Sequence, residues 1–309
     1  MISVPEGVRS QFPLDRLTTV RTGGPAQFYA RAGEQALLEE LLAWAAAEGL
    51  EISVVGSGSN LLVADEGVTG LVVKLDGRLA GIEEDGEHLC CGGGARLPAI
   101  AARAAQLGLS GIEFGVNIPG TVGGAVRMNA NAYGGELARV IEWVDVIDSE
   151  GSRRRAPGQL GFSYRSSNLG SGEVVARARF ALQRADPSTV RATLAQMRAR
   201  RREAQPSGIR TFGSTFKNPD DPRAQGRSAG QLLDAAGCRG LRIDEHSRAR
   251  LSERHANFVE NQGGASTAEI IALMAAARAR VTDRFGVDLE PEVQTLGPVR
   301  FPWKDVARR

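Results

Sequence analysis

Two glycine-rich stretches, at residues 56–60 and 118–125, constrain the fold of this chain more than any other feature. The first follows an apolar run at residues 52–55 that is typical of a buried strand. Glycine tolerates φ above zero and lets the backbone lie against a ligand. Two such loops favour one elongated ligand held between them, although glycine-rich turns also join strands in plain barrels.

The first loop reads Gly-Ser-Gly-Ser-Asn, and successive small residues let backbone N–H groups converge on an anion such as a dinucleotide pyrophosphate. It is not the Rossmann fingerprint, because it lacks the third glycine and leads into a Leu-Leu-Val run at residues 61–63 instead of a helix. It also lacks the Lys-Ser/Thr ending of a P-loop. Taken alone, the loop is equally compatible with phosphate binding and with a tight turn between strands.

The composition is that of a globular enzyme, with 42% hydrophobic residues in a chain of 309. A chain of this length is expected to form two or three domains. The net charge of +2, from 38 basic and 36 acidic residues, gives no general nucleic-acid footprint. The histidines do not cluster with the cysteines at ligand spacing, so we expect no metal site.

No apolar stretch is long enough to span a bilayer, and no charged segment followed by an apolar core opens the chain. The cysteines Cys90, Cys91 and Cys238 are an odd count with two adjacent, which does not make a disulfide framework. We therefore expect a protein of the reducing cytoplasm that has no membrane partner.

Hydrophobic periodicity predicts a mixture of strands and helices. Helical spacing and capping residues predict helices at residues 34–49, 98–107, 187–202, 228–236 and 267–285, the last capped by Thr267. Strand patterns fall at residues 26–30, 52–56, 71–75, 79–84, 88–92, 140–147 and 174–182, and near 256–260. Residues 1–16 are expected to be a loose leader, residues 111–136 an irregular binding region, and the tail after residue 295 peripheral.

Seven motifs run through the chain in order. They are Thr18–Ala26, Val54–Leu62, Ile118–Glu136, Phe162–Ser167, Gly213–Pro219, His255–Phe258 and Leu289–Val293. Together they resemble the UDP-N-acetylenolpyruvoylglucosamine reductase family, in the shorter subtype that lacks a tyrosine-bearing loop over the UDP. Each motif alone is weak, whereas the ordered set spans nearly the whole chain and is highly specific.

The resemblance implies an α+β fold. Residues 1–186 would form a two-subdomain FAD-binding domain of the vanillyl-alcohol-oxidase (PCMH) type, divided into about 17–76 and 77–186. Residues 187–309 would form a smaller α+β substrate-binding domain, joined to the first through the helix at 187–202.

The resemblance also implies a reaction, the reduction of UDP-N-acetylglucosamine enolpyruvate to UDP-N-acetylmuramate with NADPH through FAD, in peptidoglycan precursor synthesis. Negative charge develops beside the substrate carboxylate, so the enzyme must stabilise that charge and deliver one proton to carbon. The family motifs make Ser214 the proton donor and Arg165 the residue that holds the substrate carboxylate. They make Glu292 the third catalytic residue.

Without the resemblance, the interpretation of Ser214 as a turn or N-cap serine is favoured. The alternative for Arg165 is a surface arginine at a strand end. The alternative for Glu292 is a strand carboxylate that faces solvent. Glu290 lies two positions away on the same side of an extended strand, unless Pro291 between them disturbs that alternation. The choice of Glu292 depends on the motif.

The remaining site residues also follow from the motifs. FAD is assigned to Gly56, Ser57, Gly58, Ser59, Asn60, Leu61, Ile118, Pro119, Gly120, Thr121, Gly123, Gly124 and Ala125. Substrate binding is assigned to Tyr164, Arg165, Lys217, Asn218 and His255, with Asn257 as a weaker candidate beside His255. A lone histidine is more often a structural hydrogen-bonding group.

Two other functions remain open from the residues. An oxidase or dehydrogenase of the same fold explains the glycine loops but not Gly213–Pro219 together with Leu289–Glu292. A non-enzymatic nucleotide-binding protein would tolerate loss of Ser214, Arg165 or Glu292. The partner expected here is a small molecule, the UDP-sugar enolpyruvyl ether, with no nucleic acid or membrane, and the protein is expected to be a monomer or weak oligomer.

Overall fold

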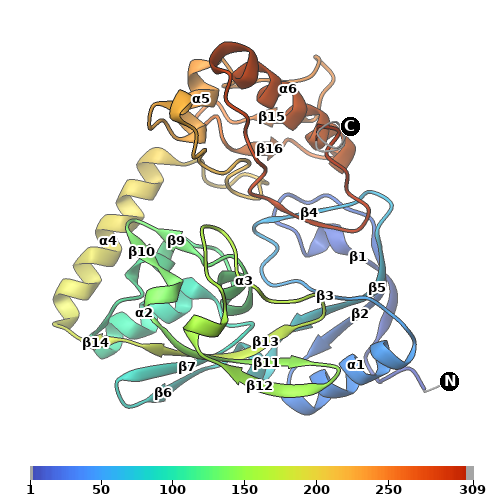
Figure 1. Cartoon of the computed structure of the whole chain (residues 1–309), viewed down its shortest axis with the longest axis vertical. Helices are drawn as coiled ribbons and strands as arrows, with labels where there is room; N and C mark the ends of the chain where they lie inside the picture. Colours follow the sequence, from blue (N-terminus) through green and yellow to red (C-terminus); the bar gives the residue numbers. More distant parts are fainter. Residues whose placement is uncertain (1–2, 304–309) are drawn as a thin grey trace. The chain divides into compact units, whose positions relative to one another are not determined.

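The computed structural model describes residues 3–303. These residues form two compact units, shown with their helices and strands in Figure 1. The first unit comprises the described residues up to Phe12, Gln27–Ser57 and Thr69–Glu203. The second comprises Pro13–Ala26, Gly58–Val68 and the described residues from Ala204 onward.

One four-stranded sheet has the order β1 (Arg9–Pro13), β2 (Pro25–Ala32), β5 (Val68–Leu75), β3 (Ile52–Val54). Helix α1 (Gln35–Ala47) buries Leu38, Leu41 and Leu42 in the core beside this sheet, the spacing from which the helix was expected. The expectation of a loose leader is wrong for β1 and for the 3-10 turn at Leu14–Arg16, where Leu14 is fully buried.

A five-stranded antiparallel sheet in the first unit has the order β12 (Gly151–Arg155), β11 (Ile141–Asp148), β13 (Val174–Ala181), β7 (His88–Gly92), β6 (Ile82–Asp85). Helices α2 (Leu97–Leu107) and α3 (Val122–Arg127) contribute to its apolar core. As expected, α2 ends at a glycine, Gly108, in the left-handed region at φ +66°.

Two expectations for this unit need correction. Residues 79–84 are not one strand, because a 3-10 turn at Gly77–Ala80, capped by the Asp76 side chain, precedes β6. The region 111–136 is not irregular throughout, because it holds a 3-10 turn at Glu113–Asn117, α3, and the pair β9 (Asn131–Ala132) and β10 (Gly135–Glu136). These elements are too short for a hydrophobic period to reveal them.

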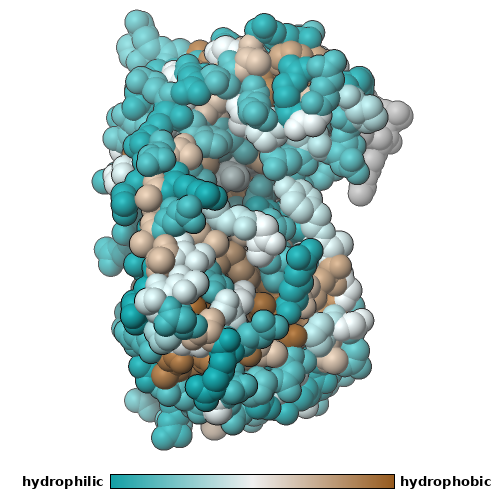
Figure 2. All heavy atoms as spheres, turned by 90° about the vertical axis from the view of Figure 1, so that its left-hand side faces the viewer, coloured by the Kyte–Doolittle hydropathy of each residue, from teal (hydrophilic) through white to brown (hydrophobic). Residues whose placement is uncertain are grey.

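Helix α4 (Pro187–Ala204) extends the helix expected at 187–202. It buries only Val190 and Leu194. A further strand pair joins β8 (Leu109–Ser110) to β14 (Gln183–Arg184). Figure 2 shows the face on which α4 lies in Figure 1, and hydrophilic residues predominate there. This agrees with the sparse burial along α4.

The second unit contains α5 (Ala229–Ala235), α6 (Thr267–Phe285), the antiparallel pair β15 (Ala249–Leu251) and β16 (Val259–Asn261), and the parallel pair β4 (Leu61–Val63) and β17 (Gln294–Leu296). The tail after residue 295 is not wholly peripheral, since Phe301 is buried in this unit's core. Residues 304–309 of that tail lie outside the described part of the chain.

The cap of α6 also differs from the expectation. Ser266, not Thr267, is the N-cap, and its Oγ accepts a hydrogen bond from the Glu269 N–H at 3.0 Å. The Thr267 hydroxyl instead donates to the Val63 carbonyl at 2.6 Å. A contact with a distant segment therefore takes the hydroxyl that the local sequence pattern assigned to the cap.

Within residues 3–303, no helix is both long and apolar enough to cross a membrane.

Candidate active site

The segment that carries Ser214 lies between two other segments of the second unit. Antiparallel bridges join Ser214 to Phe258 and Phe216 to Pro291. The Glu292 N–H donates to the Thr215 carbonyl at 2.9 Å. Ser214 and Glu292, which are far apart in the sequence, are thereby brought onto neighbouring extended segments.

Burial holds this segment at both ends. Phe212 and Phe216 are fully buried, whereas Ser214 between them is half-buried. Gly213, directly before the serine, has φ +82°, a backbone conformation that residues with a side chain rarely adopt. The hydroxyl of Ser214 is therefore carried by a fixed backbone on a part of the chain that still has exposed surface.

Asn257 is the residue that fixes the Ser214 segment most directly. Its Oδ1 accepts from the Phe216 N–H and its Nδ2 donates to the Phe216 carbonyl, both at 2.9 Å. The side chain thus pairs with both the N–H and the carbonyl of Phe216, as the backbone of a neighbouring strand would. Asn257 is only 4% exposed. Sequence reasoning placed Asn257 among the weaker nucleotide contacts, because its position beside His255 does not reveal the distant backbone that it binds.

The expected phosphate-binding residues follow in the same unit. Lys217 forms an ion pair with Glu290 at 3.2 Å, and the Glu290 side chain is 72% exposed. An exposed pair of this kind contributes little stability, so breaking it would destabilise the protein little. The Asn218 Oδ1 accepts from the Ala229 N–H at 3.1 Å and so holds the start of α5.

His255 has the contacts of a structural residue. Its Nδ1 accepts from the Asn257 N–H at 3.3 Å, and its ring packs edge-on against Phe258. Burial, with a smaller contribution from the charge of Arg239, lowers the pKa of His255. The ring is closely packed, since a Cβ on Gly230 would lie 2.8 Å from its Cε1. A neutral, packed imidazole is suited to orienting the Asn257 backbone.

Arg165 belongs to the first unit and lies at the tip of a tight turn. Ser163 and Ser166 exchange backbone hydrogen bonds at 3.1 and 3.2 Å, which leaves Tyr164 and Arg165 as the two tip residues. Arg165 has φ +57°, in the left-handed region that residues with a side chain seldom adopt. A non-glycine residue held there costs roughly 1–3 kcal/mol, and such strain clusters at functional sites.

Side-chain contacts also orient the arginine. Its Nη1 donates to the Asn131 carbonyl at 3.3 Å, and its guanidinium carbon lies 5.5 Å from the centre of the Tyr164 ring. Tyr164 is 47% exposed. The turn therefore presents a cation and an aromatic hydroxyl together at the surface of the unit.

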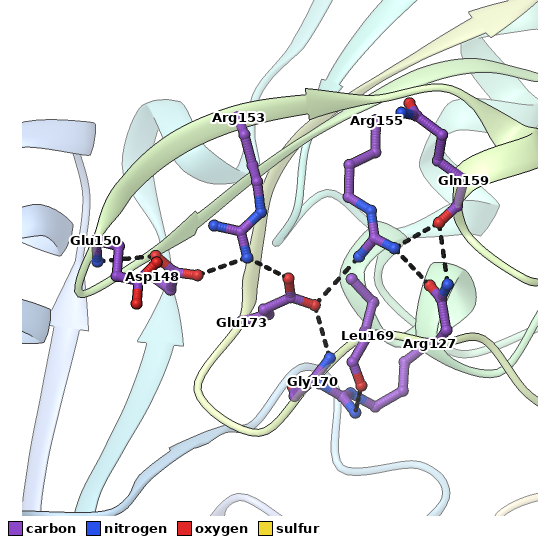
Figure 3. A network of polar contacts seen from close by, with 10 residues as sticks. Arg127, Asp148, Glu150, Arg153, Arg155, Gln159, Leu169, Gly170 and Glu173 are labelled. Carbon is purple, nitrogen blue, oxygen red and sulfur yellow. Dashed lines mark hydrogen bonds and ion pairs between the residues drawn. The ribbon is translucent and has the colours of Figure 1, made fainter.

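A polar network anchors residues 167–173, the loop that follows this turn (Figure 3). Glu173 contacts Arg153 and Arg155 of β12, and its Oε2 accepts from the Gly170 N–H at 2.6 Å. Arg127 of α3 donates to the carbonyls of Leu169 and Gly170 at 3.3 and 3.1 Å. One carboxylate and one guanidinium thus fix the loop to the sheet and to α3.

We expect Glu173→Gln to lower the melting temperature by about 2–6 °C at pH 7, because it removes the charge that two arginines share. Burial raises the pKa of Glu173, but hydrogen bonds from Gly170 and Arg153 and the charges of Arg155 and Arg153 outweigh burial and lower it. A lowered folded-state pKa gives stability that is present above the unfolded-state pKa, about 4.3, and lost as pH falls through the folded-state value.

The measurement is thermal unfolding from pH 7 to pH 3, with Glu150→Gln, an exposed carboxylate on the adjacent turn, as the matched control. The difference between Glu173→Gln and wild type should shrink toward the acid end. A difference that stays constant with pH would show that the charge of Glu173 does not contribute.

The two glycine loops meet within the first unit. A Cβ on Gly56 would lie 2.4 Å from Oγ1 of Thr121, so only glycine allows the first loop to approach the second this closely. Thr121 is buried and directly precedes α3. The structure therefore places residue 56 of the first predicted FAD loop against the predicted FAD loop at 118–125.

A lysine that the sequence reasoning missed supports the first loop. Lys74 of β5 donates to the Gly56 carbonyl at 2.6 Å. Burial, together with the charges of Arg31 and Arg96, lowers the pKa of Lys74. The sequence signal for Lys74 was its place within the apolar run of β5. In a strand pattern, such a lysine is typical of an edge or solvent-facing position.

The residues of the first unit fit the pyrophosphate of FAD. The Ser57 hydroxyl oxygen is buried and has no hydrogen-bond partner among the described residues. A buried hydroxyl without a partner is unfavourable, and a phosphate oxygen would satisfy it. The backbone at Gly56, which has no side chain, and the positive charge of Lys74, which binds the Gly56 carbonyl, also suit a pyrophosphate.

The rest of the first loop belongs to the second unit. Gly58 has φ +63°, and a Cβ there would lie 1.9 Å from the Leu17 carbonyl oxygen. Asn60 donates through Nδ2 to the Glu292 carbonyl at 3.3 Å and accepts from the Gln294 N–H at 3.1 Å. The predicted cofactor loop and the predicted catalytic glutamate are therefore hydrogen-bonded neighbours.

Comparison with known proteins identifies relatives along the whole chain. The family of the FAD binding domain matches residues 26–156, and the family of the UDP-N-acetylenolpyruvoylglucosamine reductase C-terminal domain matches residues 205–296. UDP-N-acetylenolpyruvoylglucosamine reductase 2 of Symbiobacterium thermophilum is 42% identical over 98% of this chain and 96% of its own. The reductase of Heliobacterium modesticaldum is 41% identical over 93% and 90%.

A solved structure agrees with these relatives. The crystal structure of UDP-N-acetylenolpyruvylglucosamine reductase (MurB) from Thermus caldophilus matches with a TM-score of 0.80 at 34% identity, covering 94% of this chain and 99% of that one. The expected α+β class, an FAD-binding domain followed by a smaller C-terminal domain, is confirmed.

Proposed function

This chain belongs to the UDP-N-acetylenolpyruvoylglucosamine reductase family, and from that premise we propose that Ser214, Arg165 and Glu292 form its catalytic group. The enzyme is an FAD-dependent oxidoreductase that uses NADPH to reduce UDP-N-acetylglucosamine enolpyruvate to UDP-N-acetylmuramate, in peptidoglycan precursor synthesis. The observation that carries the assignment of Ser214 and Glu292 is the hydrogen-bonded pairing of the Ser214 segment with residues 290–292, whereas Arg165 is assigned by its match to the family motif.

Ser214 acts as the proton donor to carbon. When bound, FAD supplies the two-electron chemistry that links NADPH to the enolpyruvyl double bond. The substrate then needs a proton at the carbon beside its carboxylate. A serine hydroxyl is a poor acid in water, and it serves here because the carbon that it meets is strongly basic. General acid catalysis of this kind requires that the donor is held in place. The buried side chains of Phe212 and Phe216 hold the backbone on both sides of Ser214.

Arg165 and Glu292 are the other two members of the proposed catalytic group. The guanidinium of Arg165 is planar and always charged, so it can hold the substrate carboxylate in fork geometry and stabilise the charge that spreads into it. Glu292 polarises the site around Ser214. Its backbone N–H donates to the Thr215 carbonyl, and its carbonyl accepts from Asn60.

The remaining assignments concern binding. Lys217 meets the UDP diphosphate as a point charge, and Asn218 and Tyr164 supply neutral hydrogen-bonding groups. His255 is assigned to the nucleotide end of the substrate, and its Nδ1 also accepts from the Asn257 N–H. FAD is held by the residues assigned to it in the two glycine loops, with Lys74 beneath the first. By function, we propose that residues 1–186 bind FAD, with subdomains at about 17–76 and 77–186, and that residues 187–309 bind the substrate. The compact units divide the chain differently, since residues 13–26 and 58–68 belong to the unit formed after residue 203.

The setting is the cytoplasm, with the UDP-sugar enolpyruvyl ether as the partner and a monomer or weak oligomer as the assembly. Cys90, Cys91 and Cys238 are buried free thiols, which suits a reducing compartment. Burial raises the pKa of Cys91 to about 12, so that this thiol is inert.

The test of the function is spectroscopic. Purified protein should be yellow, or become yellow with FAD, and should oxidise NADPH at an appreciable rate only when the UDP-enolpyruvyl sugar is present. Protein that stays colourless after incubation with FAD would refute the cofactor assignment. Rapid NADPH oxidation with another alcohol or sugar, but not with the UDP-enolpyruvyl sugar, would instead indicate another flavin enzyme of the same fold.

A further inference from the structure

Asn129 lies at the start of the β9–β10 segment and is fully buried. Its amide makes three hydrogen bonds within the first unit. Nδ2 donates to Glu136 Oε1 at 2.6 Å and to the Ser163 carbonyl at 3.1 Å, while Oδ1 accepts from the Ala138 N–H at 3.1 Å. Both amide protons and the amide oxygen are therefore used by the protein.

The backbone at this position also favours asparagine. Asn129 has φ +38°, in the left-handed region that asparagine tolerates better than most residues. Aspartate has the same shape but no amide protons. Glycine accepts the backbone conformation but has no side chain to donate. These two substitutions therefore separate the hydrogen bonds of the residue from its backbone conformation.

The Ser163 carbonyl that Asn129 binds is the one that closes the turn carrying Arg165, since it also accepts from the Ser166 N–H. On the other side of the turn, Arg165 donates to the Asn131 carbonyl. The turn is thus tied to one short stretch, residues 129–131, at two points. Movement of that stretch would move the strained tip with it.

We propose that Asn129 is a positioning residue that sets the direction of Arg165, and through it the affinity for the substrate carboxylate. The inference rests on the carboxylate-binding role given to Arg165 above. Asn129 itself touches neither substrate nor cofactor. The Nδ2–H donor to Ser163 holds the turn closed, and the bond to Glu136 holds the amide in the orientation that makes this donation possible.

Asn129→Asp is the first test variant. It should raise the KM for the UDP-enolpyruvyl sugar at least about ten-fold, because the Ser163 carbonyl loses its donor and faces a carboxylate. The rate at which NADPH reduces the bound flavin should stay within about two-fold of wild type. Asn129→Gly should give a similar rise in KM, since it keeps the backbone conformation and removes the side chain.

The double variant Asn129→Asp with Glu136→Gln separates the two donor contacts. In Asn129→Asp the new carboxylate faces Glu136, and this like-charge pair should lower the melting temperature. In the double variant the glutamine amide can donate to the new carboxylate, so the melting temperature should return toward that of wild type. The Ser163 carbonyl still lacks its donor, so the KM should stay raised. Full recovery of KM in the double variant would overturn the proposed role of the Ser163 contact.

Asn168→Asp is the matched control, since Asn168 follows the turn closely in the sequence and its side-chain amide hydrogen-bonds Arg155 and the Gln159 carbonyl. It should leave the KM unchanged. An unchanged KM in flavin-containing Asn129→Asp, or equal losses in flavin reduction and substrate turnover, would overturn the proposal.

Two readouts keep this result separate from the proposed function. Calorimetry with UDP-N-acetylmuramate measures binding without turnover, and failure of the wild-type protein to bind it would count against the substrate assignment. Hydrogen exchange over residues 160–168 reports the turn without any ligand, and it should be faster in Asn129→Asp than in wild type. Unchanged exchange there would overturn the role of Asn129 whatever the substrate proves to be.

Discussion

Replacement of Ser214 by alanine should slow reduction of the UDP-enolpyruvyl sugar by about a thousand-fold, within the range by which a general acid contributes to rate. Reduction of the bound flavin by NADPH should stay within about two-fold of wild type, because no proton from Ser214 is needed in that half of the reaction. The two half-reactions are measured separately by stopped-flow absorbance under anaerobic conditions.

The structure makes this substitution informative. Phe212, Phe216 and the Asn257 amide hold the backbone on both sides of Ser214, so removal of one hydroxyl leaves the segment in place. Ser207→Ala, at an exposed serine that precedes the same segment, is the matched control and should leave the rates of both half-reactions unchanged. Equal slowing of both half-reactions in Ser214→Ala would refute the proton-donor role.

Arg165→Lys should lower kcat/KM for the UDP-enolpyruvyl sugar by about a hundred-fold, mainly through KM, and again spare flavin reduction. Lysine keeps the positive charge but has no planar fork, so the two parallel hydrogen bonds to a carboxylate are lost. Neither side chain is favoured at φ +57°, so the strain at the tip is nearly the same and the comparison isolates the head group.

The control for this variant is Arg154→Lys. Arg154 is exposed on β12, pairs with Asp145 at 2.8 Å and stacks on Trp143, and it does not belong to the turn. Its replacement should leave kcat/KM within about two-fold, because a surface pair contributes little. If Arg165→Lys behaves like Arg154→Lys, the carboxylate is bound elsewhere.

Much of the fold followed from local patterns in the sequence. The apolar spacing at residues 37–42 predicted α1, and Gly108 marked the end of α2 because a helix that ends in the left-handed region favours glycine there. The two glycine loops predicted an extended ligand, and the contact of Gly56 with Thr121 brings them together as that prediction needs. The order of the motifs predicted the family.

Other features were beyond any local pattern. Thr267 was predicted to cap α6, but its hydroxyl binds the Val63 carbonyl and Ser266 takes the cap. Lys74 and Asn129 were not singled out from the sequence, because the contacts that give them their roles are with distant backbone groups, the Gly56 carbonyl for Lys74 and the Ser163 carbonyl for Asn129. A short sequence window contains neither partner.

The sequence by itself determined the family, the fold class and the identities of the candidate catalytic residues, because these depend on residue types in a fixed order. Only the tertiary structure decided which segments pair. It joined residues 13–26 and 58–68 to the unit formed after residue 203, and it set residues 214–217 between 257–258 and 290–292. The physical reason is that such pairing depends on backbone hydrogen bonds and burial between segments far apart in the chain, for which local propensity carries no information.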